Sequence, residues 1–159
     1  MKPFILLYSH SGNTRRVGQT LAQLTGGDFA EIVPIHPYPT DYNAVVDQAK
    51  GEIRKGFLPE LQPVSADLAA YDTIFIGTPN WWSTMAPPVA SFLHQSDLAG
   101  KRLAPFCTHG GGGLARVARD IKGACPQCEM AEPFEIYGDG GAALEQKLLA
   151  WLRNLGIDL

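Results

Sequence analysis

One stretch near the N-terminus decides the fold of this chain: Phe4-Ile5-Leu6-Leu7-Tyr8-Ser9-His10-Ser11-Gly12-Asn13-Thr14. It begins with an unbroken apolar run, which is typical of a strand buried on both faces of a parallel sheet. A polar turn follows, and then Val17, Leu21 and Leu24 recur at the spacing of one helix face until Gly26-Gly27 ends the pattern. The stretch therefore predicts a strand, a tight turn and a helix.

The same change of period recurs along the chain. We expect further strands at 29–35, 73–77, 102–107 and 132–137, and further helices from Thr40 or Asp41 to about 54, at 87–93, at 114–121 and at 144–155. Alternating strands and helices predict an α/β fold, a three-layer α/β/α sandwich around a five-stranded parallel sheet. The expected strand order is 2-1-3-4-5, with a ligand at the switch between strands 1 and 3.

Composition limits the class of protein. The 159 residues are 45% hydrophobic and 18% charged, so we expect a single domain over residues 1–159. The net charge of −3 excludes the strongly basic balance of a dedicated nucleic-acid binder. The apolar run near the N-terminus is too short for a signal peptide, and no stretch approaches the roughly 18 apolar residues of a membrane span. We therefore expect a cytoplasmic protein with no nucleic-acid or membrane partner.

The first turn, from Ser9 to Thr14, has the composition of a phosphate-binding loop. It places hydroxyls, an amide and a glycine at the N-terminus of a helix, where unpaired backbone N–H groups attract an anion. The Gly-Lys-Ser/Thr ending of a phosphoryl-transfer loop is absent, which favours a phosphate that is held and not transferred. A simple helix cap at Ser11 or Asn13 is the alternative, although a cap needs only one such residue.

The turn after the third expected strand, 78–88, contains the adjacent tryptophans Trp81 and Trp82. Neighbouring side chains on an extended chain point in opposite directions, so both indoles cannot enter one core. We expect at least one of them to face a planar aromatic ligand, a partner or the surface. Ordinary packing on the core is the alternative for either tryptophan.

The turn after the fourth expected strand is Thr108-His109 followed by four glycines. Glycines let the backbone approach a flat ligand closely, and a flexible lid without ligand contact is the alternative. Gly110, Gly112 and Ala115 also match the dinucleotide fingerprint G-x-G-x-x-G/A, but a run of glycines produces this match easily. Because the turns after strands 1, 3 and 4 meet at the carboxyl edge of such a sheet, together they predict one ligand site.

These turns make the chain similar to the flavodoxin family, and more closely to its flavodoxin-like FMN reductase branch. The resemblance rests on Ser9-x-Ser11-Gly12-Asn13-Thr14, on Gly77-x-Pro79-x-Trp81-Trp82 and on the glycine-rich turn. It implies a flavodoxin-like fold over nearly the whole chain and a noncovalent FMN. Position 80 is more often aliphatic in these relatives, so Asn80 is a departure from their pattern.

The resemblance also implies which residues hold the cofactor. The phosphate would lie on the first turn, at Ser9, His10, Ser11, Gly12, Asn13 and Thr14. The isoalloxazine would lie between the other two turns, at Pro79, Asn80, Trp81, Trp82, Thr108, His109, Gly110 and Gly111.

The function implied is electron transfer. We expect an FMN-dependent oxidoreductase that passes electrons from NAD(P)H to a quinone or another small acceptor, with His109 as the candidate catalytic residue. The alternative is a non-enzymatic flavodoxin-type carrier that docks on protein redox partners, which the chain's mild acidity disfavours. A third interpretation is a binding or regulatory module that has lost the flavin. The sequence is compatible with a monomer or a homodimer.

Two further features are weaker. Cys125-Pro126-Gln127-Cys128 is a C-x-x-C pair, but it follows a helix and precedes a strand, unlike a thioredoxin-like site, and a zinc site would need two more ligands. We expect no metal, and a redox role for the pair is the less favoured interpretation. Arg116, Arg119 and Lys122 share a helical face that could meet an NADPH phosphate or an acidic partner, although most such faces are solvated.

Overall fold

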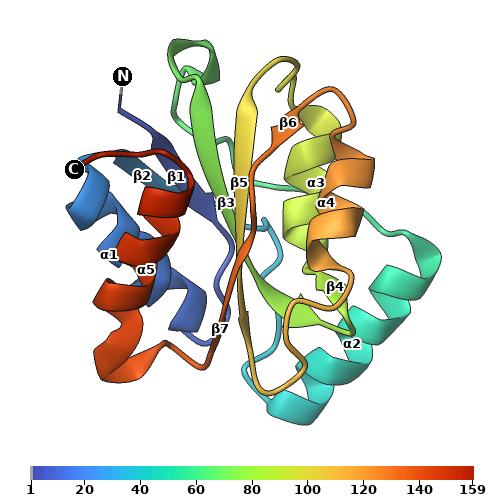
Figure 1. Ribbon diagram of the computed structural model, residues 1–159. Helices are drawn as coiled ribbons and strands as arrows, with labels where there is room; N and C mark the ends of the chain where they lie inside the picture. The colour runs from blue at the N-terminus through green and yellow to red at the C-terminus, as the bar shows by residue number, and fades with distance from the viewer. Residues whose placement is uncertain (1) are drawn as a thin grey trace.

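The protein is built around a sheet that carries helices on both faces (Figure 1). The structure, a computed structural model, describes residues 2–159, so Met1 of the expected domain lies outside the described residues. The strands are β1 (Phe4–Leu7), β2 (Asp28–Glu31), β3 (Thr73–Trp81), β4 (Thr84–Met85), β5 (Arg102–His109), β6 (Glu129–Met130) and β7 (Phe134–Tyr137). The helices are α1 (Asn13–Thr25), α2 (Tyr42–Lys55), α3 (Pro87–Gln95), α4 (Val117–Ala124) and α5 (Leu144–Asn154), with 3-10 turns η1 (Leu68–Ala70) and η2 (Gly141–Ala143).

The main strands run in parallel in the order β2-β1-β3-β5, and both β6 and β7 then pair with β5. This is the expected spatial order, and the α/β fold class is confirmed. The expected count of five strands is wrong, because the described residues form seven. One addition is β4, which runs antiparallel to the end of β3.

The other addition comes from the last strand, which is broken into β6 and β7. The sequence predicted one strand over 132–137, but Pro133 has no N–H to donate to a ladder. The carbonyl of Glu132 accepts a hydrogen bond from Trp151 Nε1 at 2.7 Å. Pairing with β5 therefore resumes only at Phe134.

Two apolar cores lie on opposite faces of the sheet. Ile5 and Leu7 belong to the core under α1 and α5, whereas Phe4 and Leu6 belong to the core on the side of α2, α3 and α4. All of β1 is buried, which explains its unbroken apolar run.

Several element boundaries match their sequence signals. The helix α1 ends at Gly26, which has φ 69°, and α2 begins after Asp41, whose carboxylate accepts from the Ala44 N–H at 2.9 Å. The strand expected at 29–35 is shorter than predicted, since β2 ends at Glu31 and Pro34 forms only an isolated bridge with Leu61. None of the helices in residues 2–159 has the length and apolarity of a bilayer-crossing segment.

The close approach of α1 to the sheet fixes the first loop at the sheet edge. A Cβ on Gly18 would lie 2.1 Å from Leu7 Cδ2, so any larger residue would force the buried Leu7 side chain or the helix to move. The first turns of α1 are therefore held against Leu7, the last residue of β1.

Candidate functional site

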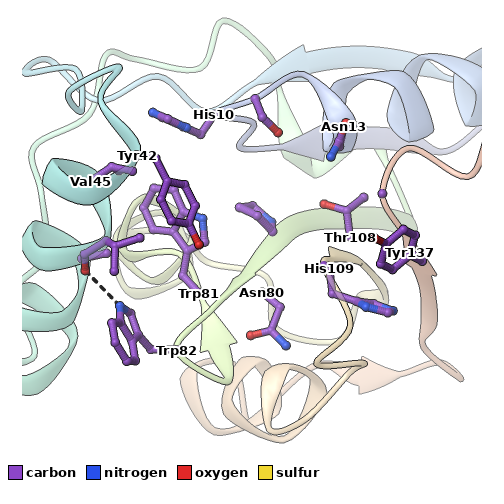
Figure 2. A pocket seen from close by; sticks show the side chains of 16 residues that line it. His10, Asn13, Tyr42, Val45, Asn80, Trp81, Trp82, Thr108, His109 and Tyr137 are labelled. Carbon is purple, nitrogen blue, oxygen red and sulfur yellow. Dashed lines mark hydrogen bonds between the residues drawn. The ribbon is translucent and has the colours of Figure 1, made fainter.

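A cleft of about 610 Å³ lies at the carboxyl ends of β1, β3 and β5, bordered by α2 on one side and by the end of β7 on the other (Figure 2). Its volume falls within the range of about 300–1,000 Å³ that small-molecule and cofactor sites occupy. All three loops singled out by the sequence reach it. The predicted residues that line it are His10, Ser11, Asn13, Pro79, Asn80, Trp81, Trp82, Thr108, His109 and Gly110.

The first loop presents backbone amides at the start of α1. Gly12 has φ 98°, and its N–H and that of Arg15 both donate to Ser9 Oγ at 3.2 Å. The N–H groups of Ser11, Asn13 and Thr14 have no acceptor within the part of the chain that the structure describes. Ser9 and Gly12 thus shape the loop from behind the cleft, and three amides remain for an anion.

Thr14 and Thr108 join the first loop to the third. Their hydroxyl oxygens are 2.7 Å apart, and both residues are buried. The Thr14 hydroxyl does not line the cleft. Of the groups of Thr14, only the backbone N–H is therefore available for the predicted phosphate contact.

His10 and Trp81 form part of an aromatic cluster at one end of the cleft. His10 Nε2 bonds the carbonyl of Pro39 at 2.9 Å, and since a carbonyl only accepts, this nitrogen carries a proton. The Trp81 ring meets His10, Tyr8 and Tyr38 edge-on, with centroids 5.1–5.9 Å apart. Trp81 therefore both packs on the core and faces the cleft.

The two tyrosines behind Trp81 are neutral and lie near the Glu52 carboxylate. Burial raises the pKa of Tyr8 well above its usual value, and the nearby Glu52 carboxylate adds to the shift. Burial also raises the pKa of Tyr38, whose hydroxyl donates to Glu52 Oε1 at 2.5 Å. The phenols behind Trp81 thus stay neutral at any physiological pH.

Trp82 follows the last residue of β3 and is the first residue of the turn to β4, with φ 55°. It is 45% exposed, its Nε1 donates to the Val46 carbonyl at 3.0 Å, and Lys50 Nζ lies 5.1 Å from its ring centroid. Figure 2 shows the indole reaching toward α2. Trp82 therefore attaches the β3–β4 hairpin to α2. Pro79 and Asn80, both half-buried, line the cleft next to Trp81.

His109 holds the third loop with both ring nitrogens. Nδ1 accepts from the Gly111 N–H at 3.0 Å, so the proton lies on Nε2, which donates to Glu135. The His109 side chain is 10% exposed and Glu135 is half-exposed. Gly110 lines the cleft, whereas Gly111 lies outside the lining and contributes its bond to His109.

Sequence reasoning missed one complete wall of the cleft. It is formed by Tyr42, Val45, Val46 and Ala49 of α2, with Tyr137 and Gly138 at the opposite end. The helical period of α2 shows an apolar face, but such a face alone indicates packing on the core and not a cleft wall. Tyr42 and Tyr137 are 76% and 69% exposed, and their positions carried no sequence signal.

The remaining features lie away from the cleft. Cys125 and Cys128 are joined by a disulfide at the end of α4, beside the start of β5 and therefore at the opposite edge of the sheet. Lys122 Nζ bonds the carbonyls of Pro126 and Cys128, so it does not extend an anion-binding face. Within residues 2–159, no group of three or more potential ligands is arranged to hold a metal ion.

The arginines near the third loop are partly neutralised. Arg116 and Arg119 both lie within 4 Å of the Asp120 carboxylate, which also accepts from the Thr84 hydroxyl.

A parallel α/β/α sandwich with a cleft at the carboxyl ends of its central strands defines a ligand-binding protein of the doubly wound class. Within that class the family is also clear. The family model for flavodoxin matches residues 2–155, so the chain belongs to the flavodoxin family. The resemblance to the flavodoxin family is thereby confirmed, and the closer resemblance to its FMN reductase branch stays a prediction.

Solved structures agree with this placement. The fold is similar to a candidate flavoprotein from Bacteroides eggerthii, with 26% identity, 99% of each chain covered and a TM-score of 0.86. A candidate flavoprotein from Bacteroides uniformis has 26% identity over 93% of this chain and 97% of that chain, with a TM-score of 0.83. A flavoprotein from Lactobacillus acidophilus, solved in complex with FMN, has 23% identity over 94% of this chain and 97% of that chain, with a TM-score of 0.75. Among curated protein sequences none matches the chain.

Proposed function

We propose that the protein binds FMN noncovalently in the cleft and acts as an FMN-dependent oxidoreductase, passing electrons from NAD(P)H to a quinone or another small acceptor. One observation carries the proposal: the amide-lined start of α1 opens onto the same cleft whose walls are the Trp81–Trp82 hairpin and the His109 loop. Membership of the flavodoxin family and the FMN complex of the Lactobacillus acidophilus relative support it.

The residues present fit this cofactor. The N–H groups of Ser11, Asn13 and Thr14 would hold the phosphate at the positive end of the α1 dipole. Trp81 offers a neutral aromatic wall that would exclude water from a flat ring. When bound, FMN supplies hydride and single-electron transfer, and the protein positions and tunes it.

His109 is the residue that we propose for handling a proton. Its Nε2 proton is directed at the half-exposed Glu135 carboxylate. Nε2 is therefore the ring nitrogen at which His109 would hold or release a proton, with Glu135 as its partner, while the Gly111 N–H keeps the ring oriented.

A second candidate function is the electron carrier, and the rim of the cleft favours it. Tyr42, Trp82 and Tyr137 are all exposed around the opening. Aromatic side chains are enriched where proteins meet other proteins. The rim therefore also suits docking on a redox partner.

Two measurements test these functions. The purified protein should be yellow, and its flavin bands should disappear when dithionite is added; a colourless protein that ignores added FMN would overturn both candidates. Rapid NAD(P)H oxidation with a quinone supports the enzyme. Slow oxidation combined with fast reduction by a partner reductase supports the carrier.

A substitution tests the phosphate assignment separately. Ser11→Ala removes an exposed hydroxyl at the cleft and should weaken FMN binding several-fold, since hydrogen bonds to charged groups are among the stronger ones. Ser65→Ala, at an exposed serine outside the lining of the cleft, is the matched control. Equal affinities for the two variants would contradict the assignment.

A further inference from the structure

The β3–β4 hairpin is held in an unusual backbone conformation. Trp81 pairs with Thr84, so Trp82 and Ser83 are the two central residues of the turn, with φ of 55° and 71°. Such turns normally use Asn-Gly or a similar pair, because other residues are strained at positive φ. A strained turn of this kind persists only where its surroundings hold it in place.

Asn80 stabilises this turn on the side that faces the glycine-rich loop. Its Oδ1 accepts from the Ser83 N–H at 2.9 Å, and its Nδ2 donates to the Gly113 carbonyl at 2.9 Å. The two partners fix the orientation of the amide, because one can only donate and the other can only accept. One side chain therefore joins the second and third loops of the cleft.

The surroundings strengthen this link. A Cβ on Gly112 would lie 3.3 Å from Asn80 Nδ2, so the loop packs directly against the amide. The Arg116 N–H donates to the Ser83 carbonyl at 2.9 Å, which adds a backbone bond between the same two segments. On the other side, Trp82 attaches the hairpin to α2. An aliphatic residue at position 80 would provide neither polar bond.

We propose that Asn80 is a positioning residue that clamps the β3–β4 hairpin and the glycine-rich loop in one arrangement, so that the cleft is formed before its ligand arrives. The consequence for FMN binding rests on the proposed function. Preorganisation favours binding because the free protein has less freedom to lose.

Amide hydrogen exchange of the protein without FMN tests the clamp directly. Asn80→Ala removes both bonds and should speed exchange about tenfold or more in segments 81–84 and 110–113, measured at the Ser83 N–H, which loses Asn80 Oδ1, and at the Gly111 N–H, which donates to His109 Nδ1. Asn80→Asp keeps the acceptor for the Ser83 N–H and removes the donor to Gly113, so only segment 110–113 should loosen. Asn154→Ala, at an exposed residue ending α5, is the control and should leave both segments unchanged.

Exchange in Asn80→Ala equal to that of the unchanged protein would overturn the clamp. So would an Asn80→Asp variant that loosens segment 81–84 and leaves 110–113 protected. If Asn80→Ala does not fold, Asn80→Asp decides the question alone. These measurements need no flavin, so a protein that binds no FMN would refute the proposed function and leave the test of the clamp intact.

Titration with FMN then tests the consequence. Asn80→Ala should bind FMN about tenfold more weakly, which equals about 1.4 kcal/mol. The visible circular dichroism of bound FMN should change as well, because the walls around the ring have moved. Unchanged affinity and an unchanged spectrum would show that Asn80 does not position the flavin.

Discussion

Replacing Gly12 by alanine should show whether the shape of the first loop determines FMN binding independently of the stability of the fold. Gly12 has φ 98°, and a Cβ there would meet nothing closer than Arg15 Nη1 at 3.8 Å. The effect of the substitution is therefore backbone strain and not a clash. A left-handed conformation costs an L-residue roughly 1–2 kcal/mol, and the stiffer unfolded chain returns about 0.4–1 kcal/mol. We expect a net loss of about 1 kcal/mol if the loop keeps its shape.

The loop can instead relax, and then the loss appears in binding. Rotation at residue 12 turns the two peptide planes that carry the N–H groups of Gly12 and Asn13. The first of these bonds Ser9, and the second is one of the free amides of the cleft. A hydrogen bond to a charged group contributes about 1.5–3 kcal/mol, so losing one to the phosphate should weaken FMN binding roughly ten- to hundredfold.

Gly26→Ala is the matched control for this experiment. Gly26 has φ 69° and no atom near its Cβ position, so alanine meets a similar backbone strain there, at the far end of α1. Both variants are compared by thermal unfolding without FMN and by fluorescence titration with FMN. Gly26→Ala should lose stability, by about 2–4 °C per kcal/mol, and keep its affinity. The reasoning fails if Gly12→Ala binds FMN normally, or if Gly26→Ala weakens binding equally.

Three further changes have defined outcomes. Gly77→Ala would place a Cβ 2.2 Å from the buried Phe106 ring. Urea unfolding should therefore show that the free energy of unfolding falls by about 1–3 kcal/mol. An unchanged free energy of unfolding would mean that the Phe106 ring moves aside freely. Reducing the Cys125–Cys128 disulfide frees the unfolded chain from a short covalent ring, which should cost about 2 kcal/mol of stability. The melting temperature should therefore fall by about 4–8 °C, while the affinity for FMN stays constant. A loss of FMN binding on reduction would instead reveal that the disulfide is coupled to the cleft. Burial raises the pKa of the Cys107 thiol to about 12, and the nearby Glu135 carboxylate adds a smaller effect. A thiol reagent at pH 8 should therefore label this buried cysteine only after denaturant is added. Fast labelling of the folded protein would contradict the burial of Cys107.

The sequence was most informative where the backbone requirement is local. The change from an apolar run to a helical period located β1 and α1, and Gly12 and Gly26 marked the two ends of α1. Such signals depend on dihedral angles and on nearby residues, so they can be recognised without tertiary contacts. Because parallel strands all present their carboxyl ends at one edge, locating the strands also brought the three loops together.

Features that depend on distant partners could not be predicted in this way. The break before Phe134 needs the Glu132 carbonyl to find Trp151, which lies on α5. The turn at Trp82 and Ser83 contradicts the usual preference for Asn-Gly and is held by contacts from other segments. Locally unfavourable choices of this kind are expected at functional sites, where the rest of the fold compensates for them.

This contrast indicates where selectivity should be sought. On the proposed function, the amide-lined loop would hold a phosphate, and it would do so equally in any relative with the same turn. The α2 wall, with Tyr42 and Val46, differs in character, because its residues follow an ordinary helical period and α2 is joined to the cleft hairpin by the bond from Trp82 Nε1 to the Val46 carbonyl. Such a wall can change without disturbing the phosphate loop. We therefore infer that substitutions on α2 would alter the choice of electron donor or acceptor, whereas substitutions at residues 9–14 would alter cofactor retention.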